Sequence, residues 1–303
     1  MAVTGAPTIS RLARFSLTTA HADDLATFYE RAFGCRRLAS ERLSGPDFER
    51  LMRVQGGALS VSLTLGHEVL QLLQFDRTGR SYPTATSASD LIFQHLAIAV
   101  SDMDEAYRRL LAVGESTAIS RAGPRRLPAS SGGVTAYKFR DPEGHPLEFL
   151  AFPADQTPPI WRKTSGDVCL GIDHSAISIS DTDRSTAFYE GLGFTVSART
   201  LNQGAEQEML DDLPGVRVDV IALKPDQPKP HLELLHYRET ARGCATARSN
   251  ADVATTRLVL QAHDVSAAQG GCAGERAIVD PDGYHVLIVP PPHKPRGDIA
   301  QPR

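Results

Sequence analysis

The stretch Phe93-Gln-His-Leu-Ala-Ile-Ala-Val-Ser-Asp102, together with Asp141-Pro-Glu-Gly-His-Pro-Leu-Glu-Phe149, decides the fold of this 303-residue chain. The first segment alternates like a half-buried strand, with His95 and two alanines on one face and three aliphatic residues on the other. The second segment is a turn that leads into another strand, on which Glu148 shares a face with small or apolar neighbours. Each strand therefore offers one side chain that can bind a metal.

Composition limits the class of protein. The chain is 41% hydrophobic and 22% charged, which is typical of a globular protein long enough for two domains. A net charge of -4 argues against nucleic-acid binding and gives no reason to expect a membrane surface. No apolar run approaches the roughly 20 residues of a membrane-spanning helix, and the first ten residues lack a signal peptide's hydrophobic core. We therefore expect a cytoplasmic protein, monomeric or homodimeric, that acts on a small molecule.

Cysteine usage supports the same compartment. The four cysteines are scattered and form no Cys-x-x-Cys pair: Cys35, Cys169, Cys244 and Cys272. Reduced thiols in a cytoplasmic protein are the expected state.

Internal repeats organise the chain. Phe28-Tyr29-Glu30 recurs as Phe188-Tyr189-Glu190, and Asp141-Pro-Glu-Gly recurs as Asp280-Pro-Asp-Gly. These repeats predict four units, at 11–76, 92–153, 171–238 and 255–290. Residues 154–170 are expected to be a linker, anchored by Trp161, and residues 291–303 a flexible tail.

Each unit has the outline βαβββ. In the second unit, Ser101 or Asp102 is expected to cap a helix that runs through Leu111, with Glu105 in the capping-box position and Gly114 at the end. A strand at 134–140 then precedes the turn and the last strand. The third unit repeats the order, with a strand at 172–179, a helix at about 182–190 and later strands at 216–223 and 231–236.

These motifs resemble the vicinal oxygen chelate superfamily, which includes glyoxalase I, extradiol ring-cleaving dioxygenases and the fosfomycin and bleomycin resistance proteins. The resemblance covers residues 11–290. It implies an α+β fold of four βαβββ modules that form two curved eight-stranded sheets. It also implies a divalent metal held by one ligand from the first strand and one from the last strand of each of two paired modules.

The ligand positions of the family are filled unevenly in this chain. The second and third units keep a full set, His95 with Glu148 and His174 with Glu233. The other two units carry residues that cannot form a cation site together: Arg14, Gln71, Arg257 and Leu287. Pairing the two inner units would thus make one complete site, as in fused glyoxalases. The extradiol pairing, first with second and third with fourth, would leave two incomplete sites.

Four further residues are predicted to bind substrate: Arg125, Arg126, His231 and His285. By strand parity His231 and His285 point towards a cavity, whereas His145 should lie outside it in the turn. Arg125 and Arg126 would hold an anionic part of the substrate at the mouth, although a solvated face is the simpler use.

The resemblance implies a reaction as well as a fold. Nitrogen and oxygen ligands suit nickel, cobalt, manganese, iron(II) or zinc. A His/Glu/His/Glu set is similar to that of bacterial glyoxalase I, a lyase that moves a proton through an enediolate, with Glu148 or Glu233 as the base. We expected desolvation to raise the pKa of this base. The alternatives are an extradiol dioxygenase using His95, His174 and one Glu on iron(II), and a non-catalytic binder of the resistance type.

Overall fold

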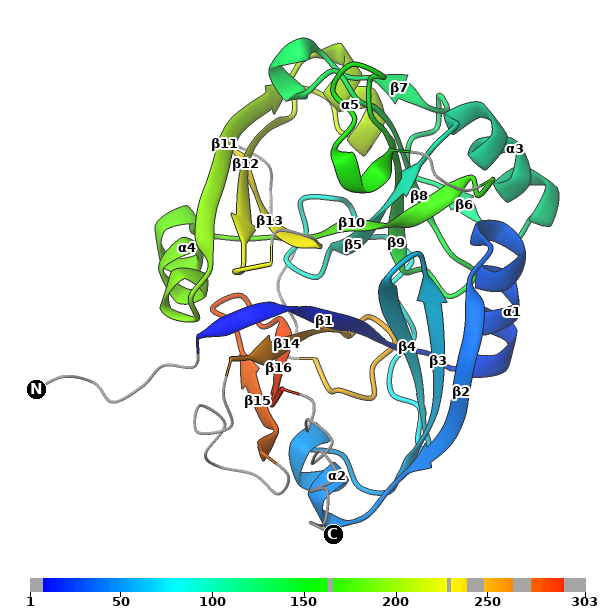
Figure 1. Cartoon of the computed structure of the whole chain (residues 1–303), viewed down its shortest axis with the longest axis vertical. Helices are drawn as coiled ribbons and strands as arrows, with labels where there is room; N and C mark the ends of the chain where they lie inside the picture. The colour runs from blue at the N-terminus through cyan, green and yellow to red at the C-terminus, as the bar shows by residue number, and fades with distance from the viewer. Residues whose placement is uncertain (1–7, 163–165, 228–229, 239–247, 264–273, 292–303) are drawn as a thin grey trace, which may run out of the picture.

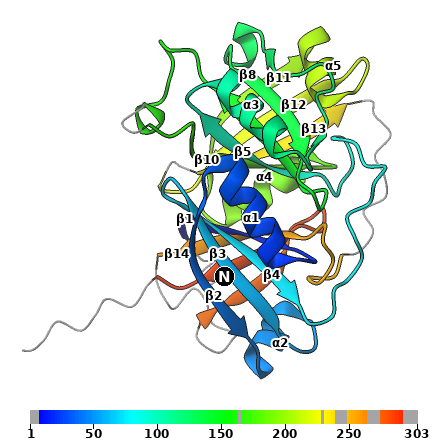
Figure 2. The same ribbon diagram turned by 90° about the vertical axis from the view of Figure 1, so that its right-hand side faces the viewer.

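Two curved β-sheets form the molecule (Figure 1). The computed structural model describes residues 8–162, 166–227, 230–238, 248–263 and 274–291. The first strands of the four units lie at the centre, and the outer strands of the two sheets curve away from it in opposite directions (Figures 1 and 2).

The strands divide between a seven-stranded and a nine-stranded sheet. The seven-stranded sheet has the order β15 (Arg276–Val279), β16 (His285–Val289), β14 (Thr256–Ala262), β1 (Ile9–Thr18), β4 (Glu68–Phe75), β3 (Ala58–Leu65) and β2 (Arg36–Leu43). The nine-stranded sheet has the order β11 (Thr195–Gln203), β12 (Arg217–Lys224), β13 (His231–Arg238), β10 (Cys169–Ser178), β5 (Gln94–Val100), β9 (Pro146–Ala151), β8 (Thr135–Arg140) and β6 (Thr117–Ala118), and β7 (Arg125–Arg126) also pairs with β8.

Five α-helices and two short 3-10 helices complete the part of the chain that the structure describes. They are α1 (Ala22–Phe33), α2 (Pro46–Met52), α3 (Met103–Val113), α4 (Thr182–Gly191), α5 (Ala205–Asp211), η1 (Ala129–Ser131) and η2 (Pro159–Trp161). The predicted caps are present: Asp102 accepts from the backbone N–H of Glu105 at 3.0 Å, and Gly114 ends α3.

The predicted fold and the predicted pairing of the inner units are confirmed. Strand β5 of the second unit pairs antiparallel with β10 of the third, and β1 pairs with β14. The two sheets have seven and nine strands, whereas eight strands were predicted for each. The two-residue strands β6 and β7 enlarge the nine-stranded sheet, and residues 264–273 of the fourth unit lie outside the described residues.

One hydrophobic core joins the two sheets. It takes buried side chains from the central strands of both, including Phe15, Ile98 and Leu258. Helix α1 of the first unit packs against β3 and β4 of its own sheet and against α3, and the ring of Phe33 reaches the other sheet, 6.1 Å from that of Phe139 and 5.8 Å from that of Phe149. Neither sheet therefore has a complete core without the other.

The repeated sequence motifs make the contacts between the sheets. The hydroxyl of Tyr29 donates to Asp141 at 3.0 Å, and that of Tyr189 donates to Asp280 at 3.1 Å. The carboxylate of Glu143 accepts from the backbone N–H groups of Ala20 and His21, at the start of α1. In the second turn, Asp282 contacts Ser180 and Ser185 at the start of α4 in the same way. Each aspartyl-proline turn thus holds the beginning of a helix from the opposite sheet.

His145 lies in the first of these turns, outside the candidate site, and is buried between the sheets. Its Nδ1 is 2.8 Å from Asp141, and its Nε2 lies 2.9 Å and 3.0 Å from the carbonyl oxygens of Thr18 and Val253. Because both ring nitrogens face acceptors, both carry a proton. Burial alone would lower the pKa of His145, but the carboxylates of Asp141 and Glu143 outweigh it and raise the pKa to about 9.

Two further sequence predictions concern membrane-spanning helices and the state of the cysteines. In the part of the chain that the structure describes, no helix is long and apolar enough to cross a membrane. Cys35 and Cys169 are buried free thiols, whereas Cys244, Cys272 and nearly all of the predicted tail lie outside the described residues.

Replacing His145 by Gln tests the contact between the sheets. A folded pKa above the unfolded value of about 6.5 means that the stabilisation is fully present below pH 6.5 and is lost as the pH rises through about 9. We expect His145→Gln to lower the free energy of unfolding by on the order of 2–4 kcal/mol below pH 6.5 and by clearly less above pH 9. Denaturant unfolding across this range measures the difference. His236→Gln, on a half-buried surface position, is the control, and a loss independent of pH would contradict the assignment.

Candidate metal centre

The register of four strands brings the predicted ligands together. Ala97 of β5 is flanked by His174 on β10 and by Glu148 on β9. Ala176 of β10 is flanked in the same way by His95 on β5 and by Glu233 on β13. The methyl groups of the alanines leave room, so that all four larger side chains share one concave face.

The ligand atoms of three residues form a compact cluster. His95, Glu148 and His174 each offer an atom within 4.8 Å of the others, and all three side chains are buried. Nε2 of His174 lies 3.9 Å from Glu148 and 3.5 Å from Glu233. Glu233 stands at the edge of the cluster, since its side chain is 21% exposed against 7% for Glu148.

His95 shows that the cluster fits a cation. Its Nε2 lies 2.9 Å from Oε2 of Glu148. The two atoms are nevertheless not aligned as a hydrogen bond, and neither ring nitrogen of His95 has a hydrogen-bond partner among the described residues. Burial lowers the pKa of His95, which favours the neutral imidazole. A buried neutral imidazole and a carboxylate whose ligand atoms lie this close suit a shared divalent ion.

Asp173 orients His174 from behind. Its carboxylate lies 3.1 Å from Nδ1 of His174 and accepts from the indole Nε1–H of Trp161 at 2.6 Å. The Nδ1–H that donates to Asp173 leaves the lone pair of Nε2 facing the two glutamates. Trp161, predicted to anchor the linker, is buried and therefore ties the linker to this site.

A β-bulge explains why Asp173 reaches the site. In the pairing with β5, Ile172 opposes Ile98 and His174 opposes Ala97, so Asp173 is the extra residue of β10. The same shift occurs in β1 between Leu12 and Arg14. Strand parity alone places Asp173 on the opposite face from His174, and the sequence analysis missed it for this reason.

A buried ion pair also lines the site and was not predicted. Nζ of Lys138 donates to Asp211 at 2.6 Å, and Asp211 also accepts from Gln207 and from the hydroxyl of Tyr237. Lys138 lies opposite Glu148 in the β8–β9 pairing. The ammonium therefore stands beside the ligand cluster while Asp211 balances its charge.

The pKa values of the two glutamates contradict one expectation. Burial raises the pKa of Glu148, but Lys138 and His95 outweigh burial and lower it. For Glu233, His174 and His231 outweigh burial and lower the pKa to about 2. The idea that desolvation raises the pKa of the basic carboxylate is thus wrong, because the neighbouring lysine and histidines outweigh burial, and both groups are carboxylates at neutral pH.

The four predicted substrate-binding residues separate in the structure. His231 lines the cavity of about 290 Å³ around the cluster, and its Nε2 lies 3.3 Å from Glu233. Arg125 and Arg126 form β7 outside this cavity, where Arg125 donates to the carbonyl of Ala122. His285 lies in the other sheet, with Nε2 3.2 Å from the carbonyl oxygen of Arg248.

The equivalent positions of the seven-stranded sheet carry no such cluster. Arg14, Gln71 and Leu287 line a separate cavity there. Arg257, which we expected beside them, does not line it: the guanidinium is fully buried and donates to Asn250 and to the carbonyl of Ser16. Only the nine-stranded sheet therefore combines imidazoles and carboxylates on its concave face among the described residues.

Comparisons with known proteins agree with this architecture. A model of the Glyoxalase/Bleomycin resistance protein/Dioxygenase superfamily matches residues 11–149 and 171–288. Among solved structures, glyoxalase I from Zea mays is similar with a TM-score of 0.57 and 16% identity, covering 92% of this chain and 92% of that chain. A Bacillus subtilis protein provisionally named a dioxygenase has a TM-score of 0.57 and 12% identity, covering 95% and 87%. The search of curated proteins finds no match. At these identities the structural matches show the fold alone.

Removing an imidazole ligand should release the metal. We expect the parent chain, stripped with EDTA, to take up one nickel or cobalt ion, and His95→Ala and His174→Ala to bind it at least ~100-fold more weakly. Isothermal titration measures the affinity. His236→Ala, which changes a His of β13 outside the cavity, should bind like the parent; equal affinity in all four proteins would exclude this site.

Asp173→Asn tests the orientation of His174 separately. The amide keeps the size of the side chain but removes the charge that fixes Nδ1–H, so metal affinity should fall by about 10–100-fold without loss of the fold. The same titration, with circular dichroism as a check on folding, measures it. An unchanged affinity would mean that Asp173 only supports the linker.

Proposed function

Because the chain belongs to the glyoxalase/bleomycin resistance protein/dioxygenase superfamily, we propose that it is a divalent-metal-dependent enzyme of the glyoxalase I type. The observation that carries this proposal is the meeting of His95, Glu148, His174 and Glu233 on one face of a single sheet. The substrate class is a 2-oxoaldehyde–thiol adduct, which is isomerised to a 2-hydroxyacyl thioester. Such an enzyme is a lyase acting on a small molecule.

A nickel, cobalt, manganese, iron(II) or zinc ion held by these four residues would polarise the carbonyl and hydroxyl oxygens of the substrate and stabilise the negative charge of an enediolate. The side chains of the chain do the proton transfer. A glutamate accepts the proton from the carbon that bears the hydroxyl and sulfur, and returns it to the neighbouring carbon. The substrate is neither oxidised nor reduced overall, so no further reactant is needed.

Glu148 is the better candidate for the base. Its side chain is more buried than that of Glu233, and its lowered pKa keeps it ionised and ready to accept a proton. Lys138, on the neighbouring strand, supports that ionised state. A low pKa makes the ground-state carboxylate a weak base, so the reaction also requires the acidity of the carbon to be raised by the polarised oxygens.

The cavity suits a small substrate. Its volume of about 290 Å³ is at the lower limit for binding sites of small organic molecules. His231 is the predicted substrate-binding residue that lines it. We propose no substrate role for Arg125, Arg126 or His285, because they lie outside this cavity. The cytoplasmic location and the monomeric or homodimeric state remain predictions from the sequence.

A second candidate function, that of an extradiol dioxygenase, is favoured by the compact group of three ligands alone. Two imidazoles and one carboxylate, His95, His174 and Glu148, match the ligand set of iron(II) oxygenases. Oxygen uptake with a catechol would indicate this function, and turnover of the thiol adduct would indicate the first. Tight binding of a small molecule with neither activity would indicate the third alternative, a non-catalytic binder.

Glu148→Gln and Glu233→Gln distinguish the base from the ligand. The amide of Glu148→Gln still offers an oxygen to a metal but cannot carry a proton, so we expect most of the metal to remain and the rate to fall by on the order of 10²–10⁴. Glu233→Gln should cost less. The measurement is metal content and turnover of a methylglyoxal–thiol adduct for both variants. Equal losses would mean that the base is assigned wrongly, and a metal-loaded but inactive parent would mean that the substrate class is wrong.

A further inference from the structure

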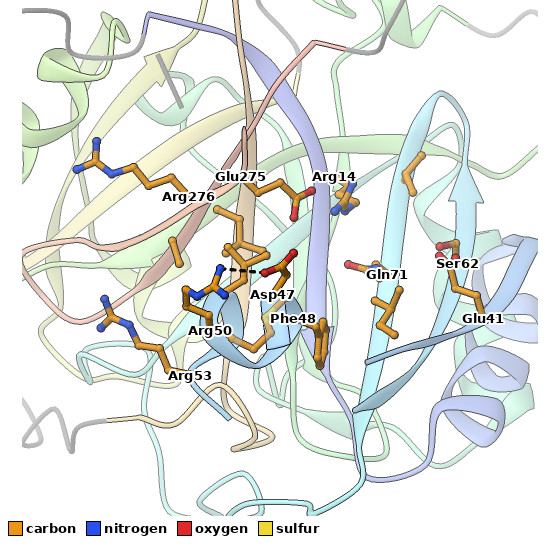
Figure 3. Close-up of a pocket in the computed structure, with 16 residues that line it drawn as sticks. Arg14, Glu41, Asp47, Phe48, Arg50, Arg53, Ser62, Gln71, Glu275 and Arg276 are labelled. Atoms are coloured by element: carbon orange, nitrogen blue, oxygen red, sulfur yellow. Dashed lines mark ion pairs between the residues drawn. The ribbon is translucent and has the colours of Figure 1, made fainter. Parts of the chain in front are cut away.

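A second cavity lies in the other sheet, and the proposed reaction does not use it. It has a volume of about 580 Å³, twice that of the cavity around the imidazoles. Its floor comes from β1, β3, β4 and β16, and helix α2 covers one side (Figure 3). A volume of this size is typical of a site for a small organic ligand.

Arg14 supplies an open hydrogen-bond donor in this cavity. It occupies the position that His174 has in the nine-stranded sheet, after the equivalent β-bulge. Its Nε is buried and finds no acceptor within the described parts of the chain. Glu275 and Glu41 act on the guanidinium only through space, and Figure 3 shows Glu275 on the Arg14 side of the cavity. A buried guanidinium N–H without an acceptor is costly, and a ligand oxygen would satisfy it.

The opposite wall is apolar. Phe48, Leu51 and Met52 project from α2, and Leu287 from β16, into one hydrophobic cluster. The ring of Phe48 also packs 6.0 Å from that of Phe75. This wall would cover the hydrocarbon part of a ligand whose polar end reaches Arg14.

The charges around the cavity favour an anion. The arginines that line it are Arg14, Arg50, Arg53 and Arg276, and the acids are Glu41, Asp47 and Glu275. Asp47 pairs with Arg50 at 2.9 Å on the exposed side of α2, so this pair cancels and three arginines remain against two glutamates. No lining residue is a histidine or cysteine, and the arginines outnumber the acids, which makes a metal ion the less suitable occupant.

We propose that this cavity is a metal-independent binding site for an organic monocarboxylate with an aromatic or branched apolar body. The carboxylate accepts from the guanidinium of Arg14, and the body packs against Phe48, Leu51 and Leu287. The site stands apart from the proposed reaction and does not depend on it.

The direct test is calorimetric titration of the full chain, stripped of metal with EDTA, with 3-phenylpropionate and with the neutral 3-phenylpropanamide. We expect saturable binding of one acid per chain. The amide should bind about 10–100-fold more weakly, because it lacks the charge that strengthens a guanidinium hydrogen bond. Arg14→Gln should weaken binding of the acid by a similar factor. Arg11→Gln is the matched control, since Arg11 lies on the same strand but donates to Gln261 outside this cavity.

Two further variants keep the test decisive if Arg14→Gln does not fold and separate this cavity from the metal centre. If circular dichroism shows that Arg14→Gln does not fold, Phe48→Ala on the half-buried wall should still lower the affinity by about 10-fold. His174→Ala should leave binding unchanged, which separates this site from the metal centre. The proposal is overturned if the parent shows no saturable binding up to about 10 mM. It is also overturned if the folded Arg14→Gln variant, or Phe48→Ala, binds like the parent, or if the loss appears in His174→Ala instead.

Discussion

The antiparallel pairing of β5 with β10 is the constraint on which the candidate site depends. In this register each candidate ligand stands beside an alanine of the neighbouring strand, and Ala97 and Ala176 hold the two halves of the site at a fixed spacing. A shift of one residue would turn one histidine to the other face of the sheet. Ile98 and Ile172 face each other in this pairing and are buried in the core between the sheets. Their burial disfavours such a shift.

The contacts between the sheets follow from this pairing. The core is shared, and Phe33 of α1 packs against Phe139 of β8 and Phe149 of β9 in the other sheet. The two aspartyl-proline turns then fix the starts of helices from the opposite sheet, with the Tyr29–Asp141 and Tyr189–Asp280 hydrogen bonds in equivalent places. The motifs that were most visible in the sequence are therefore structural, whereas the candidate ligands lie on neighbouring strands.

The sequence predicted these features to different degrees, for physical reasons. Period-2 alternation and recurring turns predict β5, β9 and β10, because buried strands carry a strong apolar pattern. The pairing of the inner units was predicted from the family resemblance and from the two units that keep both a histidine and a glutamate. Strands β2 and β11 are mostly exposed and show no such pattern, so their positions were not predicted. Asp173 was missed because a bulge breaks the alternation, and Lys138 because its partner Asp211 is distant in sequence. Arg257 was misplaced because Asn250 and the carbonyl of Ser16 draw it away from the cavity.

The two concave faces carry different side chains on equivalent strand arrangements. One face carries imidazoles and carboxylates, and the other carries Arg14, Gln71 and Leu287 at the same register positions. The most direct test of this account is the position and number of metal ions in cobalt-loaded crystals, measured by anomalous diffraction. The account predicts one peak per chain, between β5, β9, β10 and β13, with nitrogen and oxygen ligands about 2.0–2.3 Å away. A peak in the seven-stranded sheet, or two peaks of equal height per chain, would contradict it.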